Sequence, residues 1–258
     1  METVTSADGT RIAYSETGAG PLVVIVNGAL SVGADAAGIA AALADVGFRA
    51  VTWDRRARGG SGDARGSTPE REVEDLAAVI EAAGGDAIVL GHSSGAVLTL
   101  LAASRGVPMR ALFLSEPPLR FGVDEPAADL ADRLQQLVDD GRLGDAVTTF
   151  QLEGVGLPPE MVASFRASEQ FAAVEPLAQS TVYDTTLVRE ASTPDAALLS
   201  VTSPVVILRG EQTFPILIAA ASRLAAEIEG AELVIVPESV MHRVDPVATA
   251  RVIRHRTS

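Results

Sequence analysis

Short apolar runs alternate with helical stretches along most of the chain, and this alternation constrains the fold more than any other feature. Residues 22–26, with the sequence LVVIV, form a continuous apolar run that ends at Asn27 and Gly28, as expected of a strand buried on both faces. Similar patterns predict strands at 49–53, 87–90, 111–115, 205–208 and 233–236, and helices at 35–46, 69–83, 96–105, 217–228 and 246–255. Strands that alternate with helices pair in parallel, so the sequence predicts a doubly wound α/β fold, a mostly parallel sheet with helices on both faces.

The alternation stops between Pro117 and Pro194. This block contains helical stretches at 127–140 and 144–151 but no convincing buried strand. It is too long for a simple connection, so we predict a helical cap at residues 117–194, inserted in a core formed by 1–116 and 195–258. A chain of 258 residues suits one α/β domain with such an insertion.

The stretch GHSSGAV at residues 91–97 contains the pattern G-x-S-x-G, centred on Ser93. It lies between the predicted strand 87–90 and the predicted helix 96–105. A serine on a sharp turn between a strand and a helix presents its hydroxyl as a nucleophile, and flanking glycines avoid collisions with the neighbouring elements. The pattern therefore indicates Ser93 as a nucleophile. The alternative is a turn of small residues that only permits tight packing.

The residue types that the chain lacks limit its chemistry. It contains no lysine and no cysteine, which excludes a Schiff base on a protein amine, a P-loop lysine, a thiolate nucleophile and a cysteine-held cluster. None of the three histidines, His92, His242 and His255, lies three or four residues from another in the sequence, so a histidine-rich metal site is not expected, although a carboxylate-only site stays open. We predict hydroxyl, carboxylate and imidazole chemistry without a cofactor or metal.

The charge of the chain argues against two classes of partner. The formal net charge is −14, and an acidic surface repels phosphate backbones and anionic lipids, so neither nucleic acid nor a membrane is expected as a partner. No apolar run approaches the roughly 20 residues that span a bilayer, and residues 1–11 are polar, unlike a signal peptide. We expect a cytoplasmic protein that acts on a small molecule, and the sequence leaves its oligomeric state open.

Four stretches, in this order, resemble the α/β-hydrolase fold family: DGTRIAYSETGAGPLVVIVNGAL, WDRRARGGSGD, GHSSGAV and LVIVPESVMH. The likeness covers nearly the whole chain, and AVEPLAQSTVYDTTLV is similar to the small capped hydrolases common in actinobacteria. The resemblance implies the order nucleophile, acid, histidine, with Ser93 as nucleophile and His242, after the last strand, as base. It also implies an oxyanion hole formed by the backbone N–H groups of Ala29 and Ser94, although Asn27 stands where the family usually has histidine.

The acid of this triad departs from the family pattern. The usual aspartate is missing from residues 210–215, which read GEQTFP, and Glu211 lies too close to the strand end to substitute for it. Some family members carry the acid one strand after the nucleophile, where this chain has Glu116. We therefore predict a Glu116 oxygen roughly 2.6 to 3.2 Å from a His242 ring nitrogen. The alternatives are that Glu116 points to water, or that Asp184 or Asp195 supplies the acid.

Other residues receive structural interpretations. His92 lies inside the turn of the nucleophile, where a packing role is expected, and His255 belongs to an arginine-rich tail that we expect to be solvated. The arginine-rich loop 54–61 suggests an anion site, but in this family such a loop ordinarily joins strand to helix through arginine hydrogen bonds. The predicted cap contains apolar residues that either favour a moderately hydrophobic ligand or pack on the core: Phe121, Leu152, Met161, Phe165 and Phe171.

Three functions fit these residues. The first is a serine hydrolase of an ester or lactone, in which Ser93 attacks the carbonyl, His242 transfers the proton and Glu116 orients His242. The second is a non-hydrolytic enzyme, such as a cyclase, a carbon–carbon lyase or an acyltransferase in a biosynthetic pathway, because a fold does not fix a function. The third is a non-catalytic ligand binder. A serine nucleophile argues against dehalogenation and epoxide opening, which need a carboxylate.

Overall fold

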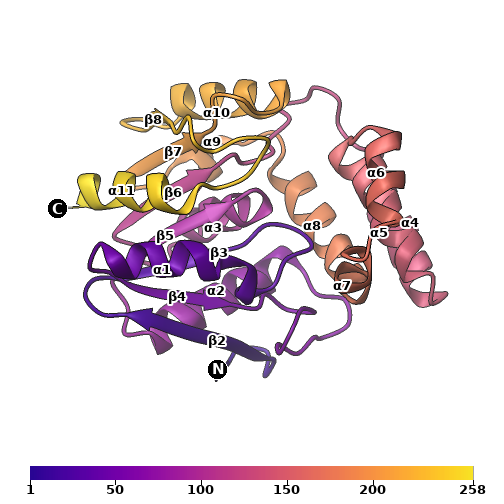
Figure 1. The fold of residues 1–258 in the computed structure, drawn as a ribbon, viewed down its shortest axis with the longest axis horizontal. Helices are drawn as coiled ribbons and strands as arrows, with labels where there is room; N and C mark the ends of the chain where they lie inside the picture. The colour runs from indigo at the N-terminus through magenta and orange to yellow at the C-terminus, as the bar shows by residue number, and fades with distance from the viewer. Residues whose placement is uncertain (258) are drawn as a thin grey trace.

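The computed structural model describes residues 1–257 and contains a central sheet with the strand order β1-β2-β4-β3-β5-β6-β7-β8 (Figure 1). Its strands are β1 (Glu2–Thr5), β2 (Arg11–Gly18), β3 (Leu22–Val26), β4 (Arg49–Trp53), β5 (Ile88–His92), β6 (Ala111–Ser115), β7 (Val205–Arg209) and β8 (Glu232–Ile235). The strands from β3 to β8 run parallel, and β2 runs antiparallel to both β1 and β4. The predicted mostly parallel α/β fold is confirmed.

Helices cover both faces of the sheet. Alternate residues of β3 point to opposite faces, so Val23 and Ile25 join one cluster of buried apolar side chains, and Val24 and Val26 join the other. The first cluster includes residues of α1 (Ala37–Asp45) and α11 (Pro246–Thr257), and the second includes residues of α2 (Pro69–Ala82), α3 (Ser94–Ser104) and α10 (Pro215–Glu227). Burial on both faces explains why the β3 run is apolar without interruption.

The part of the chain between β6 and β7 is helical. Its regular elements are α4 (Leu130–Asp139), α5 (Leu143–Thr149), a π-helical turn (Phe150–Val155), α6 (Pro159–Arg166), α7 (Phe171–Val174), a 3-10 turn (Glu175–Leu177), α8 (Ala178–Ala191) and α9 (Ala196–Leu199). We call residues 117–194 the helical insertion; its standing as a separate cap remains a prediction. The insertion has its own apolar cluster, in which Leu134, Phe150 and Phe171 are buried. In Figure 1, α8 runs between the sheet layer and the other insertion helices, and it packs against α3.

Two elements at the N-terminus escaped the sequence pattern. In β2 the buried residues 12–14 are consecutive and are followed by exposed ones, so the strand shows neither clean alternation nor a long apolar run. β1 is mostly exposed at the sheet edge and gives no apolar signal. Within residues 1–257, no helix has both the length and the apolar character needed to cross a bilayer.

Candidate active site

Ser93 occupies the turn between the end of β5 and the start of α3. Its φ of 55° and ψ of −126° lie in a region that residues other than glycine rarely adopt. Glycines permit the turn, because a Cβ at Gly95 would lie 2.1 Å from the carbonyl oxygen of Val26, and one at Gly91 would lie 2.5 Å from that of Gly95. Tight packing explains the two glycines but not a strained serine. The geometry matches the turn that presents a serine nucleophile, and the catalytic role of Ser93 remains a prediction.

Glu116 follows β6 directly and lies against His242. Its Oε2 is 2.5 Å from Nδ1 of His242, while its Oε1 accepts a 2.9 Å hydrogen bond from the backbone N–H of Gly210. The hydroxyl of Thr213 donates to Oε2 at 3.1 Å. Because the Glu116 side chain is only 3% exposed, it does not point to water. The predicted contact between Glu116 and His242 is present, and the catalytic roles of both residues remain predictions.

The surroundings of Glu116 favour a carboxylate. Burial by itself raises its pKa, but the hydrogen bonds from His242 and from the Gly210 N–H outweigh burial, and the pKa falls below its usual value. Both residues of this contact have a backbone conformation that is rare outside glycine, since Glu116 has a φ of 48° and His242 a φ of 63°. The N–H of Met241 also donates to the carbonyl of Gln212 at 2.8 Å, which joins the loop of His242 to the loop after β7.

The other acids considered for the triad lie elsewhere. Glu211 is exposed. Asp195 accepts a 2.8 Å hydrogen bond from the N–H of Leu198 and caps α9. Asp184 is buried against arginines of the loop after β4. Among these three and Glu116, it is Glu116 that contacts His242.

His92 and His255 have different surroundings from His242. The ring of His92 lies 4.6 Å from the ring of His242, and its Nδ1 is 3.4 Å from Oγ of Ser115. Burial, and then the charge that His242 can carry, lower the pKa of His92 to about 3, so its imidazole is neutral at pH 7. His255 is exposed on α11.

The loop after β3 brings backbone groups next to Ser93. A Cβ at Gly28 would lie 2.8 Å from the Cβ of Ser93, which explains the glycine at this position. The Asn27 amide donates to the carbonyl of Val32 at 2.6 Å, so the asparagine side chain stabilises its own loop. Ala29 and Ser94 line the same cavity as Ser93 and His242. Their assignment to an oxyanion hole remains a prediction.

That cavity has a volume of about 1230 Å³. Much of its wall comes from the helical insertion and from α10, and the lining is mixed. Apolar residues include Phe121, Phe150, Leu157, Met161, Val188, Ile216 and Leu217, with Phe214 before α10, and charged residues include Arg120, Glu125, Glu153, Arg189 and Arg223. Of the five apolar residues singled out in the sequence, Phe121 and Met161 line the cavity, whereas Phe165 and Phe171 pack within the insertion and Leu152 is exposed.

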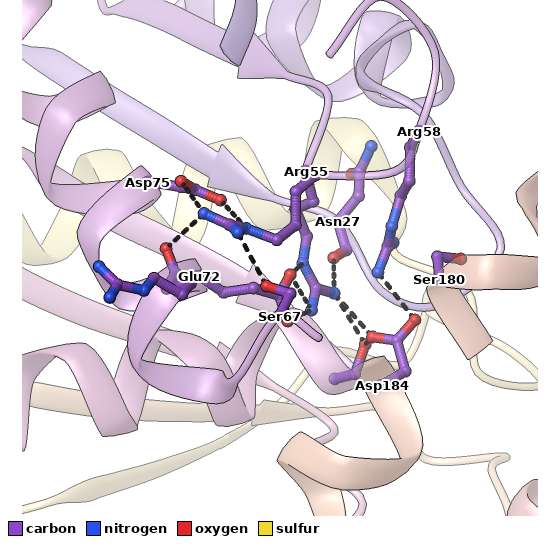
Figure 2. Close-up of polar contacts among 12 residues, drawn as sticks. Asn27, Arg55, Arg58, Ser67, Glu72, Asp75, Ser180 and Asp184 are labelled. Carbon is purple, nitrogen blue, oxygen red and sulfur yellow. Dashed lines mark hydrogen bonds and ion pairs between the residues drawn. The ribbon is translucent and has the colours of Figure 1, made fainter. Parts of the chain in front are cut away.

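The arginine-rich loop 54–61 forms buried ion pairs (Figure 2). Arg56 makes two 2.7 Å contacts with Asp75, and Arg55 makes two 2.9 Å contacts with Glu72. Asp184 of α8 binds Arg55 at 2.9 Å and Arg58 at 2.7 Å. The structural interpretation of this loop therefore accounts for its arginines.

The acidic partners of these arginines are not evident from the sequence pattern. A signal exists in α2, where Glu72 and Asp75 share the inward face with Val73, Leu76 and Val79. Buried carboxylates need buried cations, and the preceding loop supplies three arginines. Asp184 carries no comparable signal, because the buried residues of α8 mix polar and apolar types. Ser180, Thr181 and Thr185 are buried there, and so are Val182, Tyr183 and Leu187.

Comparison with known proteins identifies the class of protein to which this fold and this arrangement of residues belong. A family model described as alpha/beta hydrolase family matches residues 23–252. The chain is similar to an alpha/beta hydrolase from Sphaerobacter thermophilus, with 40% identity over 100% of both chains and a TM-score of 0.92. The chain belongs to the α/β-hydrolase family.

More distant structures share the fold alone. One is an esterase from Exiguobacterium antarcticum, 20% identical over 90% of this chain and 89% of that chain, with a TM-score of 0.68. Another is an enol-lactonase from Burkholderia xenovorans, 20% identical over 99% of this chain and 97% of that chain, with a TM-score of 0.71. The comparison with curated proteins gives no significant match.

Proposed function

We propose that the protein is a serine hydrolase that cleaves a carboxylic ester or lactone, with Ser93 as nucleophile, His242 as base and Glu116 as the acid that orients His242. One observation carries the proposal: a buried carboxylate lies 2.5 Å from Nδ1 of a histidine that shares a cavity with a strained serine. A histidine held in this way acts as a base through its other nitrogen.

In the proposed mechanism Nδ1 of His242 carries a proton and donates it to the hydrogen bond with Glu116. Nε2 is then free to accept the proton of Ser93 as Oγ bonds to the substrate carbonyl carbon. The carbonyl electron pair moves to oxygen, and the N–H groups of Ala29 and Ser94 stabilise the oxyanion. Collapse breaks the bond to the alkoxy oxygen, which takes the proton from His242. Water then attacks the acyl group on Ser93 by the same steps and releases the acid.

We further propose that the helical insertion acts as a cap that selects the substrate, as in the capped hydrolases of actinobacteria that the sequence resembles. Phe121, Met161 and Val188 of the insertion line the cavity of Ser93. Aromatic and aliphatic walls favour a moderately hydrophobic acyl or alcohol group, while orientation comes from a few polar groups. The volume of about 1230 Å³ leaves room for a substrate larger than acetate esters.

The test is turnover of p-nitrophenyl esters of increasing acyl length and of γ- and δ-lactones, by wild-type protein and by Ser93→Ala. We expect the wild type to be labelled by a fluorophosphonate, and Ser93→Ala to lose labelling and to lower kcat by several orders of magnitude. Ser104→Ala is the matched control, because that hydroxyl lies on the same helix as Ser94 and donates to the Leu101 carbonyl at 2.8 Å. Within residues 1–257, Ser104 is not among the residues that line the cavity.

Two results would contradict the proposal. An unlabelled wild type that binds esters without turnover would indicate a non-catalytic binder. A labelled wild type whose product acid contains no ¹⁸O after reaction in H₂¹⁸O would indicate acyl transfer to another acceptor, or a non-hydrolytic reaction.

A further inference from the structure

The carbonyl of Gly28 receives two strong hydrogen bonds. Nη1 of Arg58 donates to this oxygen at 2.7 Å, and the hydroxyl of Ser31 donates to it at 2.7 Å. This carbonyl belongs to the same planar peptide group as the N–H of Ala29, and in a trans peptide the two point in opposite directions. Donors that hold the Gly28 oxygen therefore also fix the direction of the Ala29 N–H.

Arg58 is in turn held by Asp184 of the helical insertion. Nη2 of Arg58 donates to Oδ2 of Asp184 at 2.7 Å (Figure 2). The other oxygen, Oδ1, accepts a 2.7 Å hydrogen bond from the hydroxyl of Ser94 and a 2.9 Å hydrogen bond from Arg55. One carboxylate thus contacts Ser94 directly and reaches the Gly28–Ala29 peptide through one guanidinium. These are the two residues whose N–H groups belong to the proposed oxyanion hole.

The charges in this group strengthen its hydrogen bonds. The side chains of Arg58 and Asp184 are 0% and 1% exposed. Burial, followed by the charge of Arg55, lowers the pKa of Arg58, and Asp184 opposes both effects by favouring the charged guanidinium. A charged donor makes a shorter and stronger hydrogen bond than a neutral one, and hydrogen bonding at a carbonyl polarises the N–H of the same peptide.

We propose that Asp184 is a positioning residue of the oxyanion hole: through Arg58 it orients and polarises the Gly28–Ala29 peptide, and through Ser94 it fixes the residue after the nucleophile. The helical insertion thereby supplies a part of the catalytic geometry as well as a wall of the cavity. This inference rests on the proposed serine hydrolase function, since an oxyanion forms only if Ser93 attacks a carbonyl.

The test compares Asp184→Asn with Asp75→Asn. Asp75 is a matched control: it is a buried carboxylate that pairs with Arg56 of the same loop at 2.7 Å, but Arg56 contacts neither Gly28 nor Ser94. Both variants break a buried ion pair, so both should lower Tm. Only Asp184→Asn should weaken the oxyanion hole.

Two measurements separate positioning from stability. The first is kcat and KM for a p-nitrophenyl ester, and the second is Ki for a trifluoromethyl ketone, which bonds to Ser93 and places an oxyanion in the hole. Loss of a whole oxyanion donor lowers kcat by about 10²- to 10³-fold, so weakening one donor should lower kcat by about 10- to 10²-fold. We expect Asp184→Asn to lower kcat and to raise Ki by this factor with little change in KM, and Asp75→Asn to leave all three within about threefold.

The outcomes are distinct. Equal kcat and Ki in the two variants, or a raised KM with unchanged kcat for Asp184→Asn, would overturn the inference and leave the serine hydrolase intact. A wild type without turnover or fluorophosphonate labelling would overturn both. If Asp184→Asn does not fold, Ser31→Ala decides, because it removes the second donor to the Gly28 carbonyl from a half-buried position. A several-fold loss of kcat with raised Ki supports the inference, and unchanged values overturn it.

Discussion

Replacing Glu116 by glutamine tests the proposed triad most directly, because the carboxylate accepts from three donors that an amide cannot all satisfy. The donors are the Gly210 N–H at 2.9 Å, the Thr213 hydroxyl at 3.1 Å and Nδ1 of His242 at 2.5 Å. Glutamine offers one carbonyl oxygen in place of two carboxylate oxygens, and its NH₂ group must occupy the other position.

Each orientation of the glutamine has a defined cost. With the amide oxygen toward His242, the NH₂ faces the Gly210 N–H, and two buried donors oppose each other at a cost of about 1 to 3 kcal/mol. With the amide oxygen toward Gly210, the NH₂ faces Nδ1 of His242 and selects the tautomer whose proton is on Nε2. That tautomer cannot accept the proton of Ser93. Neither orientation supplies the negative charge that stabilises an imidazolium.

We therefore expect Glu116→Gln to lower kcat by about 10² to 10⁴-fold, which corresponds to about 2.7 to 5.5 kcal/mol of transition-state stabilisation. The assay is p-nitrophenyl ester hydrolysis, with circular dichroism as a check on folding. Glu211→Gln is the matched control, since it makes the same chemical change on an exposed residue of the adjacent loop, and its kcat should be unchanged. A folded Glu116→Gln with kcat within about threefold of wild type would refute the role of Glu116.

The same substitution changes the pH dependence of stability. The pKa of Glu116 is lowered in the folded protein, so its contribution to stability is present above the unfolded pKa of about 4.3 and is lost as the pH falls through the lower folded value. Denaturation measured from pH 6 to pH 3 should therefore show a shallower loss of stability in Glu116→Gln than in wild type. A parallel decline in the two proteins would contradict the lowered pKa.

Three further predictions follow from burial and backbone geometry. Gly95→Ala places a Cβ 2.1 Å from the Val26 carbonyl oxygen and should lower the free energy of unfolding by about 3 kcal/mol. Gly38→Ala is the control, because its Cβ meets Pro246 at 3.5 Å, and it should not destabilise the protein. Equal denaturation midpoints for the two variants would contradict this expectation. The His92 ring, with a pKa lowered to about 3, should stay neutral in an NMR titration down to pH 4, and a ring that titrates near pH 6.5 would refute this. The unfolded chain binds this proton below about pH 6.5, so acidification should favour unfolding less in His92→Asn than in wild type. Backbone amides of α6 should exchange hydrogen faster than those of α8, because Val162 is the one buried residue of α6 whereas nine residues of α8 are buried. The reverse order would show that α8 is not the most stable part of the insertion.

The core of the fold could be predicted from the sequence because the central strands are buried on both faces. The residues of β3 and β6 are all buried, so each of these strands appears as an uninterrupted apolar run. β2 was missed because it pairs near the edge, where its second half is exposed. The helix α4 was predicted within a few residues because its apolar side chains recur at helical spacing, with Leu130 and Leu134 buried.

Part of the candidate site could also be predicted from the sequence, but for a different reason. Ser93 and His242 each follow a parallel strand, and Glu116 follows the strand next to that of Ser93. The strand topology therefore brings the three residues to one edge of the sheet. The contact of Glu116 with His242 joins residues 126 positions apart, and parallel strands make such distant contacts predictable.

Asp184 lies beyond this logic, because no strand order places a residue of the helical insertion. Asp184 pairs with two buried arginines, Arg55 and Arg58. Arg55 also pairs with Glu72, so two positive and two negative side chains form one buried group. Removing one member leaves an uncompensated buried charge, so the insertion is fixed to the core at α8 by electrostatics and not only by apolar packing. If the insertion acts as the proposed cap, we expect its outer helices, α4 to α7, to move while α8 stays next to Ser93. Under this proposal substrate entry and oxyanion geometry are separate properties of one insertion. A substitution in α6 should then alter KM without altering kcat, whereas a substitution of Asp184 should lower kcat.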